Sequence, residues 1–392
     1  MHAFTPDAVR ALDADDAALR VQALERAAAM PLPTPEEEVW RYSRIKELQL
    51  ADFTPAATTT TVTGVALPVT LDRSAPSTDL DDAVDVFHLL NVAFGAPIVL
   101  RIPAGHVVAE PIVVSHHIGV GGPSDGARGA AFPRLVIEVG EDAEVTVVEQ
   151  FTSDDGDRSL VVPRLEVHAA QAARFRYLGV NLLADSTWSL GHQRAVGDRD
   201  STMLLATVAL GGDYARVRTE AHAVGQGAST RQIALYFADG EQMHDFRTMQ
   251  DHAAPKTTSD LLFKGAVLDH AKSVYTGLIR IRPNAKGSVA FQTNRNLTLS
   301  EGSWAESVPN LEIETNDVKC SHASTVGPID EEQRFYLESR GIPPEVAERL
   351  VVLGFFDEVL EQLPVGPLAS ELRARVGAKL DASSSVLAGS AS

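Results

Sequence analysis

Residues 197–205 (GDRDSTMLL), 211–219 (GGDYARVRT), 225–233 (GQGASTRQI) and 240–248 (GEQMHDFRT) decide the fold, because each opens with turn residues and continues as an alternating run. The same pattern begins near Gly140, Ala170, Asp269 and Asn284. The starts lie about 14 to 15 residues apart, or about twice that, which is typical of stacked strand-and-turn units. We therefore expect a β-solenoid. A jelly roll or sandwich is the alternative that this periodicity leaves open.

The composition divides the chain into four parts. Residues 1–85 are expected to form an N-terminal helical region followed by a linker: an alanine-rich helix lies near residues 13–27, Pro31 stops it, and residues 52–85 are rich in Thr, Pro, Asp and Ser. Residues 86–326 form the mainly β core, residues 327–382 a C-terminal helical domain, and residues 383–392 a disordered tail.

The C-terminal domain carries clear helix boundaries. Asp330 is expected to cap a helix with Gln333 at its third position, and Gly341 ends it. Pro343 and Pro344 open the next helix, and a third runs from about residue 367 to 380. The second helix is expected to bury one apolar stripe, which contains Val346, Leu350, Leu353 and Phe356.

Charge and apolar content exclude several classes of protein. Acidic residues outnumber basic ones by 53 to 34, giving a formal charge of -19, so nucleic acid is not an expected partner. No apolar run approaches the roughly 20 residues of a membrane span, and the start lacks the pattern of a secretory signal. The single cysteine excludes an intrachain disulfide. We therefore expect a cytoplasmic protein that does not bind membranes.

Common catalytic motifs are missing from the sequence. It contains no glycine-rich phosphate loop, no Gly-x-Ser-x-Gly elbow and no His-Glu-x-x-His pair. His116 and His117 would point to opposite faces of a strand, so they are not expected to share an ion. His244, His252 and His270, each beside an aspartate, would form a zinc or iron site only if the rungs stacked them together.

Cys320 and His322 are the strongest candidate ligands. Residues two apart lie on the same side of a strand, so the thiol and the imidazole could share one metal or cluster. Two ligands do not complete a tetrahedral site, so the others would come from elsewhere in the fold or from another chain. The alternative is that Cys320 is a small buried apolar residue.

Several segments together resemble one family. Residues 296–300, 309–313, 317–322, 327–330 and 335–342 closely resemble the C-terminal signature of the SufB/SufD family, the scaffold subunits of the SUF iron-sulfur cluster assembly system. Residues 252–259 and 264–265 also resemble it. The segment 38–43, the chain length and the Cys-Ser-His form of the signature are SufD-like, and the further cysteine expected of SufB is missing. Ala323 replaces the usual family glycine, so the local turn after His322 is expected to differ.

The resemblance implies a fold and a set of partners. It implies a right-handed parallel β-helix core flanked by N-terminal and C-terminal helical domains, and a non-catalytic scaffold that pairs with a SufB-like subunit through the β-helix. It further implies that a SufC-like ATPase docks on the C-terminal helices, where the candidate contact residues are Phe335, Tyr336, Arg340 and Gly341. His322, with Cys320 beside it, would face a nascent iron-sulfur cluster or iron at the SufB interface.

Other functions stay open at this point. A β-helix carbohydrate-active enzyme would need an array of carboxylates or basic residues on one exposed strand face, and none stands out. A SufB-like homodimer, also open when the chain is expressed alone, would offer only one thiol per chain. A flavin in the assembled complex is compatible with the resemblance, but no motif indicates one. The cluster type and the proteins that receive it are not encoded in any motif.

Overall fold

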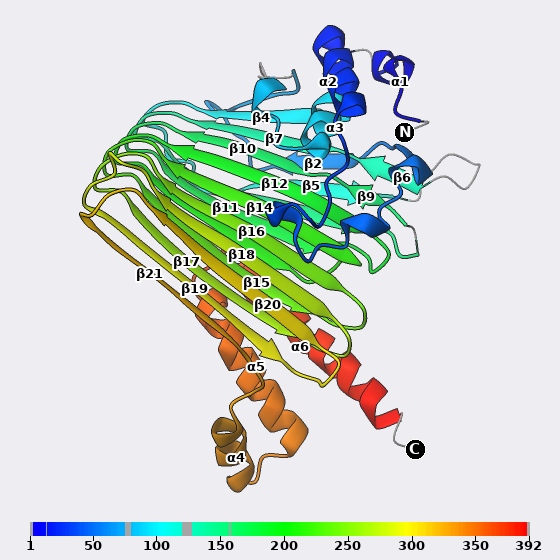
Figure 1. The fold of residues 1–392 in the computed structure, drawn as a ribbon, viewed down its shortest axis with the longest axis vertical. Coiled ribbons are helices and arrows are strands. Elements are labelled where there is room, and N and C mark those ends of the chain that lie inside the picture. Colours follow the sequence, from blue (N-terminus) through cyan, green and yellow to red (C-terminus); the bar gives the residue numbers. More distant parts are fainter. Residues whose placement is uncertain (1–2, 13, 75–79, 120–127, 157, 390–392) are drawn as a thin grey trace.

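The computed structural model describes residues 3–12, 14–74, 80–119, 128–156 and 158–389, with side chains through residue 382. About 45% of the structure is strand and 22% is helix, and most strands stack as a parallel β-solenoid of about seven turns. The N-terminal helices lie at one end of the solenoid and the C-terminal helices at the other (Figure 1). The prediction of a parallel β-helix with helices at both termini is confirmed, and the jelly-roll alternative is excluded.

The solenoid has two sheets. In spatial order, sheet A contains β20 (Trp304–Ile313), β18 (Lys272–Ile281), β16 (Met243–His252), β14 (Tyr214–Ala223), β12 (Trp188–Gly197), β10 (Arg164–Ala169), β7 (Pro133–Val139), β4 (Ala96–Ile102) and β3 (Thr70–Asp72), with β1 (Phe53–Pro55), β6 (Arg128–Ala131) and β9 (Leu160–Val161) beside this path. Sheet B contains β2 (Thr59–Thr63), β5 (Ile112–Ile118), β8 (Glu144–Ser153), β11 (Arg174–Leu182), β13 (Thr202–Ala209), β15 (Ser229–Ala238), β17 (Thr258–Val267), β19 (Ser288–Thr298) and β21 (Val318–Gly327).

The strand register explains the sequence repeat. Thr202 of β13 pairs with Ser229 of β15, which pairs with Thr258 of β17, and parallel neighbours from β12 onward are paired about 26 to 32 residues apart. Each turn of the solenoid contributes one strand to each sheet, so successive strands along the chain start at about half that spacing. The 14-to-15-residue repeat is therefore one strand and its turn. Asp142, Asp200 and Asp269 occupy positive φ values at such turns, a conformation that short polar side chains tolerate.

The N-terminal region covers part of the outer face of sheet A. It contains α1 (Pro6–Arg10), α2 (Ala17–Ala29), the short 3-10 helices η1 (Glu38–Trp40), η2 (Ile45–Glu47), η3 (Leu50–Asp52) and η4 (Leu80–Asp82), and α3 (Val86–Phe94). The expected alanine-rich helix is α2, which ends before Pro31. Trp40 is buried against Phe87, and the Arg216 guanidinium of β14 lies 4.0 Å from its ring centroid.

The segment 52–85, expected to be a linker, instead adds strands to the core. β2 pairs antiparallel with β5, and β3 pairs antiparallel with β4. The threonine run in β2 has β-branched side chains, which favour extended backbone, and these pairings cover edges at the start of the solenoid. Residues 75–79 of this segment lie outside the described residues.

The C-terminal helices are α4 (Glu331–Ser339), α5 (Pro344–Leu360) and α6 (Gly366–Gly389). The Asp330 carboxylate accepts hydrogen bonds from the N–H groups of Glu332 and Gln333, as the expected N-cap, and Gly341 has a φ of 86°. α6 runs beyond the expected end, because no glycine or proline interrupts residues 381–388. The expected disordered tail therefore overlaps this helix up to Gly389, and residues 390–392 lie outside the described residues.

α5 and α6 pack on the outer face of sheet B. Val352, Phe356 and Val359 of α5 are fully buried against a surface that includes Leu235 and Phe237 of β15. The expected stripe on α5 is only half right: Leu353 and Phe356 are buried, but Val346 and Leu350 are exposed. The first turns of α5 lie beyond the sheet (Figure 1), so the side chains of Val346 and Leu350 have no sheet surface to pack against, although Ala347 beside them is buried. Within the described ranges, no helix is both long enough and apolar enough to span a membrane.

Candidate functional site

The last turn of the solenoid has two open edges. β20 ends the path of sheet A and β21 ends the path of sheet B, so each has a neighbour on only one side among the described strands. Most side chains of β20 and β21 are exposed or half-buried, whereas those of β16 are nearly all buried. Such long edges present unpaired N–H and C=O groups, which can pair with another chain. We call this end, formed by β20 and β21, the open end of the solenoid.

Cys320 and His322 both lie on β21, on its inward side. Cys320 pairs with Ala290 and His322 with Gln292 of β19, while the next inward residue, Ser324, donates a hydrogen bond to Ser307 of β20 (2.6 Å). The Cys320 thiol is partly buried beside a small aliphatic cluster, and this burial raises its pKa. His322 is exposed. The structure thus places the two predicted ligands on one face at the open end.

The residue after His322 adopts ordinary strand geometry. Ala323 lies inside the continuous strand β21 and pairs with Thr293. Extended backbone suits alanine, so no left-handed conformation is needed here. In this chain the strand therefore continues past His322, and no turn follows it directly.

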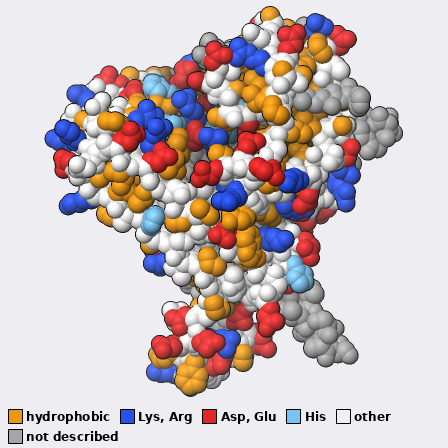
Figure 2. Space-filling view, in the orientation of Figure 1, with side chains coloured by type: hydrophobic (Ala, Val, Ile, Leu, Met, Phe, Trp, Pro, Cys, Tyr) orange, Lys and Arg blue, Asp and Glu red, His pale blue; other side chains and the backbone are white. Residues whose placement is uncertain are grey.

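The predicted partner-binding residues gather around α4, at the far tip of the C-terminal domain. Phe335 is 70% exposed and Tyr336 is 57% exposed, and the Arg340 guanidinium lies 5.1 Å from the Tyr336 ring centroid. Val346 and Leu350 of α5 add two more exposed apolar side chains. Figure 2 shows hydrophobic side chains among charged ones on this lobe. We call Phe335, Tyr336, Val346 and Leu350 the tip patch.

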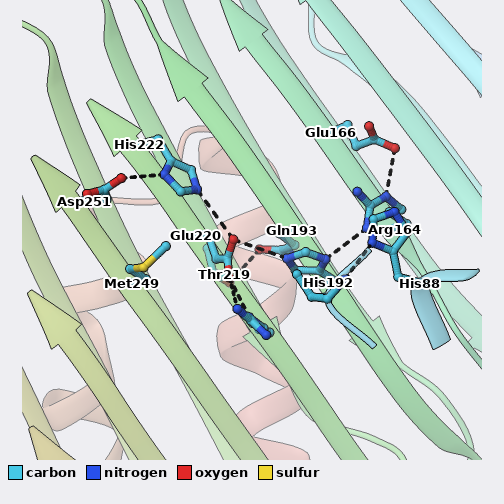
Figure 3. A network of polar contacts seen from close by, with 12 residues as sticks. His88, Arg164, Glu166, His192, Gln193, Thr219, Glu220, His222, Met249 and Asp251 are labelled. Atoms are coloured by element: carbon cyan, nitrogen blue, oxygen red, sulfur yellow. Dashed lines mark hydrogen bonds and ion pairs between the residues drawn. The ribbon is translucent and has the colours of Figure 1, made fainter. Parts of the chain in front are cut away.

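A ladder of histidines and carboxylates crosses the outer face of sheet A (Figure 3). His222 Nδ1 lies 2.8 Å from Asp251, and its Nε2 lies 3.5 Å from Glu220, which also faces His192 Nε2 at 3.7 Å. Burial alone would lower the pKa of His222, but its two carboxylate partners raise it. The same contacts hold the pKa of Glu220 below its usual range although burial opposes this. The imidazole of His222 therefore lies between two carboxylates, with a hydrogen bond to Asp251 at Nδ1 and an ion-pair contact with Glu220 at Nε2.

Sequence reasoning missed this ladder, although a signal for it exists. Arg164 and His192 lie 28 residues apart, and so do His192 and Glu220; His222 and Asp251 lie 29 apart. These separations equal one turn of the solenoid. Polar residues that recur at this interval, rather than within one motif, mark side chains that stack on neighbouring strands.

The other histidines do not form a metal site. His244 and His252 lie on the same strand, β16, eight residues and so about 26 Å apart. His252 contacts the Thr257 and Ser259 hydroxyls, at 2.7 and 2.8 Å. No group of three or more histidine, cysteine, aspartate or glutamate side chains is arranged to hold a metal ion anywhere in the described part of the chain. The expectation that His116 and His117 point to opposite faces of a strand is confirmed, because His116 is buried against Glu149 and His117 is exposed.

Comparison with known proteins agrees with this architecture. The family model "SUF system FeS cluster assembly, SufBD core domain" matches residues 123–355, more than half of the chain. The chain belongs to the SufB/SufD family. The matched residues include the β-solenoid turns from β7 onward, together with Cys320, His322 and the tip patch.

Similar proteins carry names from the same family. An iron-sulfur cluster assembly SufBD family protein of Mycobacterium tuberculosis is 33% identical over 370 residues, which covers 90% of each chain. The iron-sulfur cluster assembly protein SufD of Escherichia coli is 28% identical over 391 residues, 92% of each chain. The SufD protein of Bacillus subtilis is 31% identical over 247 residues, 62% of this chain and 56% of that protein.

Proposed function

We propose that this chain is a SufD-like, non-catalytic scaffold subunit in iron-sulfur cluster assembly in the cytoplasm. Family membership supports the role in cluster assembly. The observation that carries the proposal is the open end of the solenoid, where Cys320 and His322 share one face of an edge strand that has room for a partner. The nascent cluster is the cargo of this site. A SufB-like subunit would supply the ligands that this chain does not offer.

The tip patch would dock a SufC-like ATPase. It lies on the helical lobe that extends away from the solenoid (Figure 1), and the side chains of Phe335 and Tyr336 are 70% and 57% exposed. Exposed aromatic residues near arginine are typical of interface anchors. ATP hydrolysis by the docked partner would then act on the scaffold through α5 and α6, which are packed on sheet B.

The experiment reconstitutes the complex from this chain, a SufB-like protein and a SufC-like ATPase. Mass is measured by light scattering, and iron and sulfide are measured after cluster build-up. We expect His322→Ala to lower cluster content while leaving the mass of the complex unchanged. The paired variant Phe335→Ala with Tyr336→Ala should instead release the ATPase and keep the SufB-like subunit.

The outcomes separate the proposal from its alternatives. If His322→Ala and the wild type build clusters equally, the ligand role is refuted, and equal loss of complex formation would mean that His322 serves packing. A stable homodimer that builds clusters without a SufB-like protein would refute the heterodimer and favour two copies paired through their open edges. Ser321→Ala, on the opposite face of β21, is the matched control.

A further inference from the structure

Residues 39–44 of the N-terminal region cross the outer face of sheet A, and we call them the crossing segment (Figure 1). The Arg216 guanidinium of β14 donates to the Val39 carbonyl (2.7 Å), and the Arg247 guanidinium of β16 donates to the Arg41 carbonyl. Both arginines are buried. Hydrogen bonds from charged donors are among the strong ones, so these two contacts hold the crossing segment on the sheet.

Tyr42 brings the crossing segment to the edge strand of sheet A. Its ring centroid lies 6.0 Å from that of Trp304, the first residue of β20. The contacts of the segment therefore advance from β14 through β16 to β20, which is the order of these strands towards the open end. The chain then turns back, because Arg44 pairs with Asp213, the residue before β14 (2.6 Å). Tyr42 thus lies at the tip of a loop that reaches the open edge.

The backbone at this tip is strained. Tyr42 has a φ of 64°, in the left-handed region that a bulky side chain rarely occupies. Its side chain is still 44% exposed, and Trp304 is 37% exposed. Packing within the chain therefore buries only part of the two rings that the strained loop brings together. Strain of this kind is concentrated at functional sites, and here it places an aromatic pair beside an open strand.

The half of β20 beside the aromatic pair offers hydrogen bonds to a further strand. The N–H of Trp304 donates to the carbonyl of the residue before β18 (3.1 Å), so it points into the sheet. Because these groups alternate along a strand, the N–H groups of Ala305 and Ser307 point to the open side. Pro309 has no N–H and interrupts this row of donors. A strand of another chain is therefore expected to pair with the first half of β20, directly beside the aromatic pair.

The charges on β20 favour a partner other than a second copy of this chain. β20 contains Glu306 and Glu312 but no lysine or arginine. Two copies paired through this edge would bring four carboxylates onto adjacent strands, and like charges across strands are destabilising. Glu306 lies two residues from Trp304, so both side chains point outward. A strand with a basic side chain opposite Glu306 would instead form a cross-strand ion pair.

We propose that Tyr42 and Trp304 form an aromatic anchor for the strand of a SufB-like subunit that pairs with β20. An apolar side chain of that strand would cover the two rings, and a basic one would lie opposite Glu306. This role rests on the proposed function, in which a SufB-like subunit occupies the open end. It also extends the interface from the edges of the solenoid to the N-terminal region. Aromatic side chains buried at an interface commonly carry much of its binding energy.

Titration calorimetry with the full chain and a SufB-like subunit measures the contribution of the anchor. Tyr42→Gly removes one ring and suits the positive φ, so the loop should stay folded. Trp304→Ala removes the other ring. We expect each variant to weaken binding by about tenfold or more. The double variant should weaken binding by less than the product of the two single effects, because the rings form one surface. Val39→Ala, an exposed residue of the same segment above β14, is the matched control and should bind as the wild type does.

The outcomes separate the anchor from the proposed function and from internal packing. Denaturant unfolding of the free chains should give Tyr42→Gly nearly the same midpoint as the wild type. If the wild type binds the SufB-like subunit and both ring variants bind it equally well, the anchor is overturned and the proposed function stands. A wild type that does not bind the SufB-like subunit would overturn both. A homodimer, detected by light scattering, that Trp304→Ala dissociates would place a second copy on the anchor and overturn the choice of partner.

Discussion

Lys264 of the solenoid contacts the C-terminal helix α5, and its substitution should weaken the packing of α5 on the sheet. It lies on β17 and is only 3% exposed. Its Nζ donates to the backbone carbonyl of Phe355 on α5 (2.8 Å), forms an ion pair with Glu358, and lies 4.5 Å from the Phe355 ring centroid. We predict that Lys264→Met destabilises the packing of α5 while leaving the solenoid folded.

The size of the effect follows from these contacts. A hydrogen bond from a charged donor stabilises by about 1.5–3 kcal/mol. The ion pair adds less than about 1 kcal/mol, because Glu358 is half exposed. Methionine keeps the apolar stem buried and removes the cost of burying an ammonium group, which offsets part of the loss. We therefore expect a net loss of about 2 kcal/mol, which corresponds to about 30-fold faster amide exchange in α5.

Hydrogen exchange followed by mass spectrometry measures this directly. Peptides from α5 should lose protection in Lys264→Met, while peptides from β11 to β15 should keep theirs. Lys272→Met, which makes the same change at an exposed lysine on β18, is the matched control. Unchanged protection of α5, or an equal loss in α5 and the solenoid, would refute the assignment of Lys264 as a local joint.

Three further predictions concern single side chains. Gly265→Ala should lower the free energy of unfolding, measured with denaturant, by about 2–3 kcal/mol, because the alanine Cβ would lie 1.9 Å from the fully buried Tyr236 ring. Gly327→Ala is the control and should be neutral, because a Cβ at that position would have no atom within 4 Å among the described residues. Burial alone would raise the pKa of Asp251, but hydrogen bonds from His222 and Arg282 lower it to about 2 from the ordinary 3.8. The ionised Asp251 therefore adds to the free energy of unfolding above about pH 4, and this stabilisation is lost as the pH falls towards 2. The stability difference between wild type and Asp251→Asn should therefore shrink by about 1 kcal/mol over that range, and a constant difference would contradict this. Cys320 should react with iodoacetamide more slowly at pH 7.5 than an unstructured cysteine peptide does, because burial raises its pKa; an equal or faster rate would contradict the partly buried position.

The solenoid was predictable because residues close together in the sequence specify each of its strands and turns. Each turn needs residues that tolerate its backbone conformation, and each strand needs apolar side chains at alternate positions. Both patterns therefore recur along the chain at a nearly regular interval. The N-cap at Asp330 and the turn at Gly341 were predictable for the same reason, since a helix end depends on a few consecutive residues. Cys320 and His322 share a face because strand geometry alone requires it.

Features that depend on distant partners were not predictable from local pattern. β2 is a run of threonines whose role depends on β5, more than fifty residues later. All nine residues of α3 are buried, so the helix has no polar face to give a helical periodicity. Val346 and Leu350 fit the apolar stripe of α5, but the stripe alone does not say where the sheet beneath it ends. In each case the missing information is the position of a surface built from another part of the chain.

The two candidate ligands on β21 differ in how readily they meet a metal. Cys320 packs against aliphatic side chains, and this burial raises its pKa above that of a free thiol. Because a thiol binds a metal as the thiolate, a metal must displace this more firmly held proton before Cys320 becomes a good ligand. His322 lies further out on the same face and is exposed. An incoming iron at a partner interface would therefore meet the imidazole first. This order explains why substitution of His322, rather than of Cys320, is the sharper test of cluster assembly at the open end.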